Sequence, residues 1–200
     1  KALSKNNNVS VVSHRPFVKG MFKHHVLQEE YTISGTTTFY YTEIRDSKLY
    51  KLFSETNSIL KTAKKAINDF HSNDFIIVTD TLRVNLIKAA RIIAKTYNVK
   101  IVGMLTDNPE NLSSKSKTYI HKIKSNVSKL DGYLSLTNGL VNYFNPDIPN
   151  YIFEGLASDE ECFKKDPIYD YFFFAGSLYE RYGVKTLVDA YHESSIRTKL

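Results

Sequence analysis

The chain has 200 residues, of which 42% are hydrophobic and 24% are charged, a composition typical of a folded domain rather than a disordered tail. Its single cysteine excludes an intramolecular disulfide, and no apolar run approaches the ~20 residues that a membrane-spanning helix needs. The length indicates one domain of ordinary size, or one domain followed by the start of another.

The formal net charge of +6 is concentrated in the first half of the chain. Residues 1–100 contain 16 Lys and Arg and 8 Asp and Glu, whereas residues 101–200 contain 11 and 13, so the two halves carry +8 and −2. The excess is mostly lysine, although recognition of bases and phosphates favours the arginine fork. We therefore disfavour nucleic acid as a partner and favour an anionic membrane surface for a Lys-rich face.

The first elements are two strand patterns and a long helix pattern. A buried strand is expected over Val9–Ser13, and the β-branched and aromatic residues 32–44 indicate an extended segment or hairpin. Apolar residues then recur every three or four positions across residues 47–70, which predicts an amphipathic helix of about seven turns.

From residue 75 onward, short apolar runs alternate with helical patterns. Near-continuous apolar strands separated by helices predict an α/β fold, with a Rossmann-like parallel sheet and helices on both faces. The expected strands are residues 75–78, 99–105, 132–136 and 151–153, and the expected helices are residues 82–97, residues 112–129 and a short helix that ends at residue 144.

The pattern changes after residue 157. Residues 158–169 are acidic and irregular, and we interpret them as a linker between a first domain, residues 1–157, and a second that begins at residue 170. A strand at residues 171–175 and a helix from residue 182 to about residue 197 are expected there. These two elements predict the first strand–helix unit of a second Rossmann-like domain.

Polar residues follow the expected strands. In an open α/β sheet, ligands bind beyond the carboxyl ends of the strands, so we expect these residues to line one crevice. Helix capping is the alternative, because Thr, Asp, Asn and Ser are preferred N-caps. A solvated basic loop is the alternative for the first two residues of the set. The set comprises His14, Arg15, Thr79, Asp80, Thr106, Asp107, Asn108, Thr137 and Asn138.

Several kinds of site are disfavoured by the sequence. It contains no GxGxxG, P-loop, GxSxG or HExxH motif, which argues against a standard dinucleotide enzyme, a P-loop NTPase and an α/β-hydrolase. His24 and His25 have no partner at ligand spacing, and Cys162 has no expected base beside it. We therefore expect no metal ion and no cofactor.

Four segments of the second half carry a resemblance to a known family. They are residues 101–113 (IVGMLTDNPENLS), 130–138 (LDGYLSLTN), 151–156 (YIFEGL) and 171–191 (YFFFAGSLYERYGVKTLVDAY). In this order they resemble the GT-B glycosyltransferases, most closely the large family-four type that uses nucleotide-sugar donors. In that family, a strand with a glycine turn closes the N-terminal domain, and a second glycine-containing unit opens the C-terminal domain.

The resemblance implies transfer of a sugar from a nucleotide-sugar donor to a glycan, lipid-linked or protein acceptor in bacterial surface-glycan assembly. The donor is a substrate, so no cofactor is implied. Asp107 is the candidate catalytic carboxylate, as base or hydrogen-bond acceptor. The acceptor-binding candidates are His14, Arg15, Asp80, Thr106, Asn108 and Asn138, and the donor-binding candidates are Gly176, Ser177 and Arg181.

The sequence departs from the family pattern at three positions. Family members usually carry Arg at the position of Ser177 and Lys at that of Tyr182, and often His at that of Thr106. An alternative is therefore a non-catalytic GT-B-like subunit that stabilises or targets an active transferase, in a homo- or hetero-oligomer. A third class is an unrelated Rossmann-like domain that binds a sugar phosphate or another ligand.

The chain is expected to be a piece of a protein about twice as long. It begins without Met, and the first strand and helix of the N-terminal domain and the donor-site carboxylates of the C-terminal domain fall outside it. We therefore expect these 200 residues alone to be inactive. The complete protein is expected in the cytoplasm, peripheral to the inner face of the plasma membrane.

Overall fold

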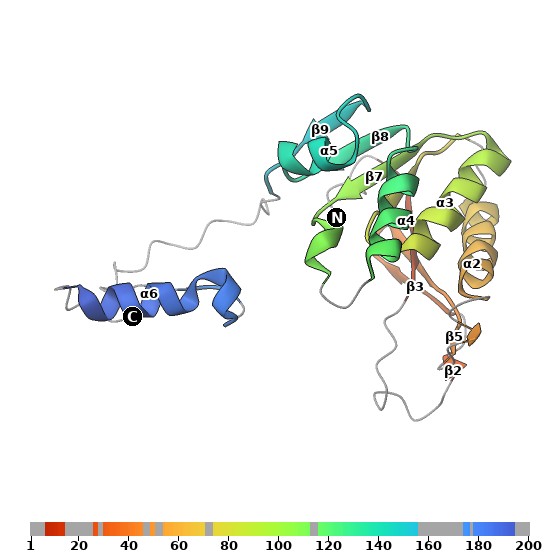
Figure 1. Ribbon diagram of the computed structural model, residues 1–200. Helices are drawn as coiled ribbons and strands as arrows, with labels where there is room; N and C mark the ends of the chain where they lie inside the picture. Colours follow the sequence, from red (N-terminus) through yellow and green to blue (C-terminus); the bar gives the residue numbers. More distant parts are fainter. Residues whose placement is uncertain are drawn as a thin grey trace. The chain divides into compact units, whose positions relative to one another are not determined.

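The computed structural model describes residues 7–14, 26–27, 30–45, 49–50, 54–70, 74–112, 116–155, 174–176 and 178–194 (Figure 1). The chain divides into two compact units, Lys1–Leu156 and Ala157–Leu200, and each is described by itself. The expected linker at residues 158–169 lies outside the described residues.

The first unit begins with a three-stranded sheet in the order β1-β4-β3. Strands β3 (Glu30–Ser34) and β4 (Thr37–Tyr41) form an antiparallel hairpin, and β1 (Val9–Ser13) pairs with β4 in parallel. Gly35 in the hairpin turn has a φ of 60°, a left-handed conformation that glycine adopts without steric cost. The expected first strand and the hairpin interpretation are therefore confirmed.

A separate two-stranded antiparallel sheet is formed by β2 (Val26–Leu27) and β5 (Ile44–Arg45).

The main sheet of the unit has four strands, all parallel, in the order β6-β7-β8-β9. Its strands are β6 (Ile77–Asp80), β7 (Ile101–Leu105), β8 (Gly132–Ser135) and β9 (Asn150–Ile152). The prediction of an α/β fold with a Rossmann-like parallel sheet is confirmed.

Strand β6 starts at Ile77 rather than at Phe75. The aromatic ring of Phe75 packs edge-on against Tyr97, at a centroid distance of 5.8 Å. Phe75 therefore contributes to packing although it does not belong to the strand. An apolar run marks which residues are buried, but it does not mark the first residue that pairs with a neighbouring strand.

Three helices lie beside one another: α2 (Glu55–Phe70), α3 (Val84–Tyr97) and α4 (Lys117–Val127) (Figure 1). Helix α4 begins five residues later than predicted. The residues before it form the short 3-10 helix η2 (Pro109–Asn111), and the side chain of Ser116 caps α4 by accepting a hydrogen bond from the Tyr119 N–H. Helix α2 begins at Glu55, and residues 49–50 of the expected helix are helical as well, whereas residues 46–48 and 51–53 lie outside the described residues.

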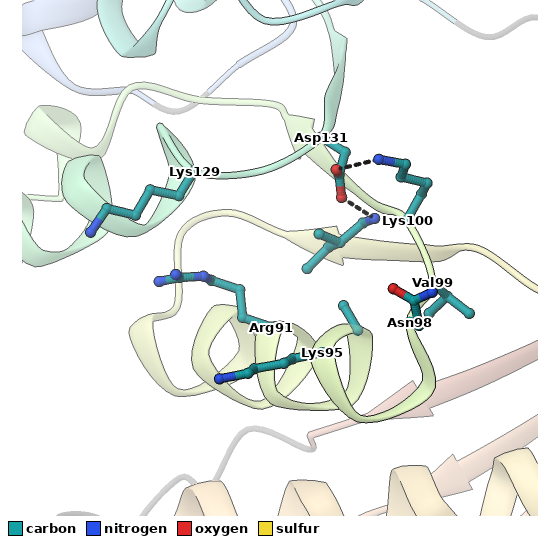
Figure 2. Close-up of a pocket in the computed structure, with 9 residues that line it drawn as sticks. Arg91, Lys95, Asn98, Val99, Lys100, Lys129 and Asp131 are labelled. Atoms are coloured by element: carbon teal, nitrogen blue, oxygen red, sulfur yellow. Dashed lines mark hydrogen bonds and ion pairs between the residues drawn. The ribbon is translucent and has the colours of Figure 1, made fainter.

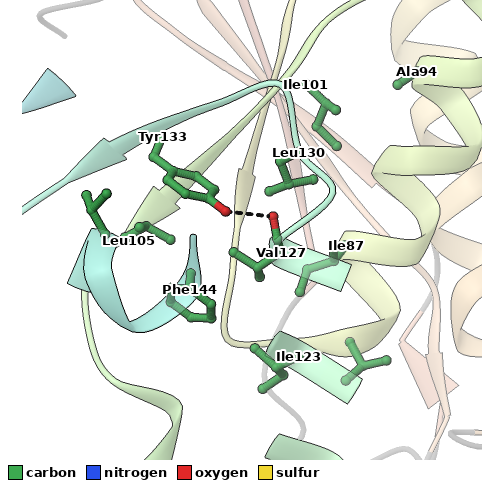
Figure 3. Packing of buried hydrophobic residues seen from close by; sticks show 11 residues of the cluster. Ile87, Ala94, Ile101, Leu105, Ile123, Val127, Leu130, Tyr133 and Phe144 are labelled. Carbon is green, nitrogen blue, oxygen red and sulfur yellow. Dashed lines mark hydrogen bonds between the residues drawn. The ribbon is translucent and has the colours of Figure 1, made fainter. Parts of the chain in front are cut away.

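The hydrophobic core lies on the face of the parallel sheet that carries α3, α4 and α5 (Asn138–Phe144) (Figure 3). Within it, the Tyr133 hydroxyl donates to the carbonyl oxygen of Val127 at 3.0 Å, and burial raises the pKa of Tyr133 to about 12. The core residues are Val84, Ile87, Ala94, Ile101, Leu105, Ile123, Val127, Leu130, Tyr133, Val141 and Phe144.

Gly103 lets this core approach β7 closely. A Cβ atom at this position would lie 2.7 Å from Leu130 Cδ1 and 2.9 Å from Thr81 Cγ2, closer than real Cβ contacts. The Thr81 hydroxyl donates to the Met104 carbonyl oxygen at 2.9 Å, which holds the Thr81 side chain in place. Only glycine fits between these two side chains without a shift of its neighbours.

The alternate residues of the parallel strands point to the opposite face. Val78 pairs with Val102, and Met104 pairs with Leu134, so these four side chains share that face. Val78 is 40% exposed, whereas Leu105 on the core face is fully buried. Coverage of this second face by helices therefore stays a prediction.

The described part of the second unit contains η3 (Glu180–Tyr182) and helix α6 (Val184–Glu193). Gly183 separates them with a φ of 77°, so α6 starts two residues after the predicted position. Residues 174 and 175 are not in a strand, contrary to the prediction, and residues 171–173 lie outside the described residues. Among the described helices of both units, none combines the length and apolar character that crossing a membrane requires.

Candidate functional site

The carboxyl edge of the parallel sheet carries several predicted site residues. Asp80 ends β6, Thr106 and Asp107 follow β7, and Asn138 begins α5 just after β8. The three strands run in parallel, with Asp80 beside Met104 and Leu105 beside Ser135. The structure therefore places these residues along the same edge, where open α/β sheets bind ligands.

His14 contacts residues of several other elements through its side chain and its backbone. His14 Nδ1 lies 2.8 Å from Thr42 Oγ1, and His14 Nε2 lies 2.9 Å from Glu55 Oε1. The second oxygen of Glu55 accepts a hydrogen bond from Asn85 Nδ2 at 2.8 Å, and Arg83 Nη1 donates to the His14 carbonyl oxygen at 3.4 Å. We call Thr42, His14, Glu55 and Asn85 the His14 network.

The His14 network joins four parts of the first unit. His14 follows β1 directly and Thr42 follows β4, while Glu55 begins α2 and Asn85 lies in the first turn of α3. A chain of charge-assisted hydrogen bonds at this point holds the ends of two strands against the starts of two helices. This network fixes the backbone on which His14 and Arg83 are carried.

A hydroxyl, an imidazole and a carboxylate in a row also occur in nucleophilic catalysis. Here the hydroxyl of Thr42 is completely buried, and the His14 side chain is only 9% exposed. A substrate therefore has no access to Thr42, and both nitrogens of the imidazole already have partners. The geometry supports a positioning role for the His14 network rather than a nucleophile.

The carboxyl group of Glu55 is half-buried and ionised. Burial acts to raise its pKa, but hydrogen bonds from His14 and Asn85 and favourable electrostatic interactions with His14 and Arg83 outweigh that effect. The pKa of Glu55 therefore lies below its ordinary value of 4.5. The sequence did not indicate Glu55 as a site residue, because it lies within the long helix pattern that starts at residue 47.

We expect Glu55 to make the free energy of unfolding depend on pH below about 4.5. Because its folded-state pKa is the lower one, its stabilising contribution is complete above the unfolded-state pKa and is lost as the pH falls through the folded-state value. Glu55→Gln should cost about 1–3 kcal/mol at pH 7 and lose less stability than the parent between about pH 5 and pH 3.

Urea unfolding at a series of pH values measures this difference. Asn85→Ala is a useful second variant, because it removes one hydrogen bond to Glu55 but leaves the carboxylate in place. It should reduce the pH-dependent loss of stability by a smaller amount than Glu55→Gln. Identical pH profiles for Glu55→Gln and the parent would contradict the role of the carboxylate.

Asp80 and Thr137 each accept a hydrogen bond from a backbone N–H group near the end of a strand. Asp80 Oδ1 accepts from the Leu82 N–H at 2.8 Å, and Thr137 Oγ1 accepts from the Leu140 N–H at 3.3 Å. The helix-capping interpretation is confirmed for Thr137, which is the N-cap of α5. It is wrong for Asp80, because the N-cap position of α3 is Arg83, which has no side-chain cap, and Asp80 instead holds the turn before that helix. Contact of these residues with a ligand stays a prediction.

Asp107 and Asn108 build the turn that follows β7. Asn108 Oδ1 accepts from the Glu110 N–H at 2.9 Å, with Pro109 in the first turn, as predicted for a cap. Asp107 Oδ1 accepts from the Asn108 N–H and from Asn111 Nδ2, both at 2.7 Å. One oxygen of Asp107 thus holds the turn, which fixes the orientation of the whole carboxylate.

The remaining predicted site residues are described in part or not at all. Arg15 and Ser177 lie outside the described residues, as do His24, His25 and Cys162. Gly176 belongs to the second unit, where an added Cβ would lie 3.1 Å from the Phe174 ring. Arg181 lies in η3, and its side chain is not among those described.

A depression of about 230 Å³ beside the start of α2 was not predicted. The Glu43 carbonyl oxygen, two residues after β4, accepts hydrogen bonds from the hydroxyls of Tyr50 at 2.8 Å and Ser58 at 3.1 Å. Lys61 and Asn57 add further polar groups to its wall. The lining can therefore hydrogen-bond to a polar ligand such as a sugar hydroxyl group.

Comparison with known proteins gives no further assignment: no family model, curated protein or solved structure matches this chain. In the part of the chain that the structure describes, no group of three or more His, Cys, Asp or Glu side chains could hold a metal ion. The chemistry of the site therefore has to be inferred from its own residues.

Proposed function

We propose that this chain is the acceptor-binding part of a GT-B glycosyltransferase that moves a sugar from a nucleotide-sugar donor to a glycan, lipid-linked or protein acceptor. The observation that carries the proposal is the polar carboxyl edge of a Rossmann-like sheet, with Asp80, Thr106, Asp107 and Asn138 along it. The ordered sequence motifs of the second half add support, and they favour bacterial surface-glycan assembly.

The proposed reaction needs a group that accepts the proton of the acceptor hydroxyl. Asp107 suits this role, because its Oδ1 atom is held by the turn and the carboxylate has a second oxygen for the substrate. As the acceptor oxygen bonds to the anomeric carbon, the bond from that carbon to the nucleotide diphosphate breaks and the proton passes to the carboxylate. We assign stabilisation of the leaving diphosphate to Gly176 and Arg181 in the second unit.

A non-catalytic subunit is the second candidate function. Ser177 and Tyr182 occupy positions where the resembling family usually carries cations, and Tyr182 is an exposed neutral side chain. Without those cations, the leaving diphosphate loses charge stabilisation that sugar transfer requires. In that case the polar edge would bind a glycan or a partner enzyme without transferring a sugar.

Incubation of the complete gene product with a panel of UDP-, GDP- and ADP-sugars tests the proposal. We expect consumption of one donor and release of its nucleotide diphosphate, and we expect no turnover by residues 1–200 alone. Absence of both binding and turnover across the panel, together with co-purification with an active transferase, would favour the non-catalytic subunit. A monodisperse protein that turns over a donor by itself would exclude it.

A further inference from the structure

A second hollow, of about 280 Å³, lies at the amino edge of the parallel sheet, away from the candidate site (Figure 2). It lies where α3 and α4 end and where β7 and β8 begin. In the parallel sheet this is the edge opposite to Asp80 and Asp107. The polar residues that line it are Arg91, Lys95, Asn98, Lys100, Lys129 and Asp131.

Four cations and one carboxylate give the lining of this hollow a formal charge of +3. Asp131 Oδ1 accepts from Lys100 Nζ at 3.0 Å, and its Oδ2 accepts from the Ile101 N–H at 2.9 Å. The hydrogen bond from Ile101 lowers the pKa of Asp131, burial opposes this effect, and Lys100 lowers the pKa further, so that the pKa lies below its ordinary value. The Asp131 carboxylate is thus ionised, and each of its oxygens already accepts a hydrogen bond at the edge of the sheet. It neutralises one lysine at most.

Basic side chains near helix ends often serve only the last carbonyl groups of the helix. Here other donors already serve one such group in each helix. The Ala94 carbonyl of α3 accepts from the N–H groups of Asn98 and Val99, and the Lys124 carbonyl of α4 accepts from the N–H and the hydroxyl of Ser128. The ammonium groups near these ends are therefore not needed to cap these two carbonyl groups.

Lys95 and Lys129 form no side-chain hydrogen bond or ion pair with the other described residues. Figure 2 shows Arg91 and Lys95 extending from α3 and Lys129 from the end of α4 toward the same side, while Lys100 contacts Asp131. Helices α3 and α4 contain no Asp or Glu that could pair with these cations. Their mutual repulsion is relieved when an anion binds between them.

Arg91 adds a fixed hydrogen-bond donor to the hollow. Its Nη1 atom donates to Asn126 Oδ1 of α4 at 2.8 Å, which restrains the guanidinium group between the two helices. A guanidinium group has five N–H donors in a planar fork, so further donors are left for a ligand. Such a fork matches the oxygen atoms of a phosphate group.

We propose that this hollow is an anion site for a phosphate group, either that of a soluble diphosphate or that of an anionic lipid headgroup. Arg91 supplies directed hydrogen bonds, and Lys95 and Lys129 supply point charges. The site is independent of the proposed sugar transfer, because it uses none of the residues at the carboxyl edge.

Calorimetric titration with inorganic pyrophosphate tests the site. The combined substitution Lys95→Gln and Lys129→Gln is expected to weaken binding about tenfold or more, since it removes two charge-assisted contacts. Lys88→Gln with Lys117→Gln is the matched control: it removes the same charge from exposed positions on α3 and α4 that do not line the hollow. The control should change the dissociation constant less than about twofold.

Sedimentation with phosphatidylglycerol vesicles separates the two sources of the phosphate. Pelleting that pyrophosphate displaces and that the Lys95/Lys129 substitutions abolish would identify the lipid headgroup. Pyrophosphate binding without pelleting would identify a soluble phosphate ligand. Absence of pyrophosphate binding at low salt, or equal weakening in both double variants, would overturn the proposal.

Discussion

Replacement of Leu105 by alanine is expected to lower the free energy of unfolding by about 2–5 kcal/mol. Leu105 is fully buried at the end of β7, among side chains from α3, α4 and α5 (Figure 3). The substitution removes three carbon atoms, the Cγ methine and the two Cδ methyl groups. Neighbouring side chains can refill this space only in part, so a cavity remains. Urea unfolding followed by far-ultraviolet circular dichroism measures the change.

Val78→Ala is the matched control for Leu105→Ala, because it shortens an aliphatic side chain of the adjacent strand on the opposite face. Val78 is already partly in contact with water, so we expect a loss of about 1 kcal/mol or less. A loss as large as that of Leu105→Ala would contradict this expectation. It would also indicate that the second face is covered, as the sequence predicts.

The packing of Leu105 has a direct consequence for the candidate site. Leu105 is the last residue of β7, and Thr106 and Asp107 follow it without an intervening residue. A buried side chain at the strand end anchors the backbone from which the polar residues emerge. The position of the polar residues at the edge therefore depends on the packing of the hydrophobic core, and a shift of the core would displace the site residues.

The sequence predicted the strands better than the helix starts. Strands β7 and β8 coincide closely with their apolar runs, because their core-facing residues are almost completely buried. Helix α4 begins later than its apolar pattern, because residues 109–111 form η2 and Ser116 provides the cap. Apolar periodicity records burial, whereas a helix start depends on which side chain satisfies the first N–H groups.

The His14 network, too, could be predicted only in part from the sequence. His14 was predicted from its position after a strand, but its partners Thr42 and Glu55 were not. Thr42 lies 28 residues from His14 in the sequence, and the two meet only because β1 and β4 pair in parallel. A pattern read along the chain carries no signal for such a contact, which depends on the pairing of distant strands.

The distribution of charge along the sequence also differs from its distribution in space. The first half of the chain carries the positive excess, yet the basic hollow combines Lys95 and Lys100 with Lys129 from the half whose net charge is negative. Helices α3 and α4 pack together, so lysines from both halves gather at one place. Net charge by segment therefore carries no signal for the surface that would bind the proposed anion.

Asp107→Asn is expected to slow sugar transfer by the complete protein about 10²–10⁴-fold if Asp107 accepts the proton of the acceptor hydroxyl. The asparagine side chain retains an oxygen at the Oδ1 position, so the hydrogen bonds from the Asn108 N–H and Asn111 Nδ2 can persist. Stability should therefore change by only about 0.5 kcal/mol. Steady-state transfer rates and urea unfolding, measured on the same preparations, separate the two effects.

Asp80→Asn is the matched control for this experiment, because Asp80 also stands at the start of the turn after its strand and uses its Oδ1 atom to accept from the Leu82 N–H. We propose only acceptor contact for Asp80, so its rate should fall about tenfold or less. If both substitutions leave the rate unchanged, Asp107 is a turn residue and not the proton acceptor. If the two rates fall equally, orientation of the acceptor by the whole polar edge, rather than one base, limits the reaction.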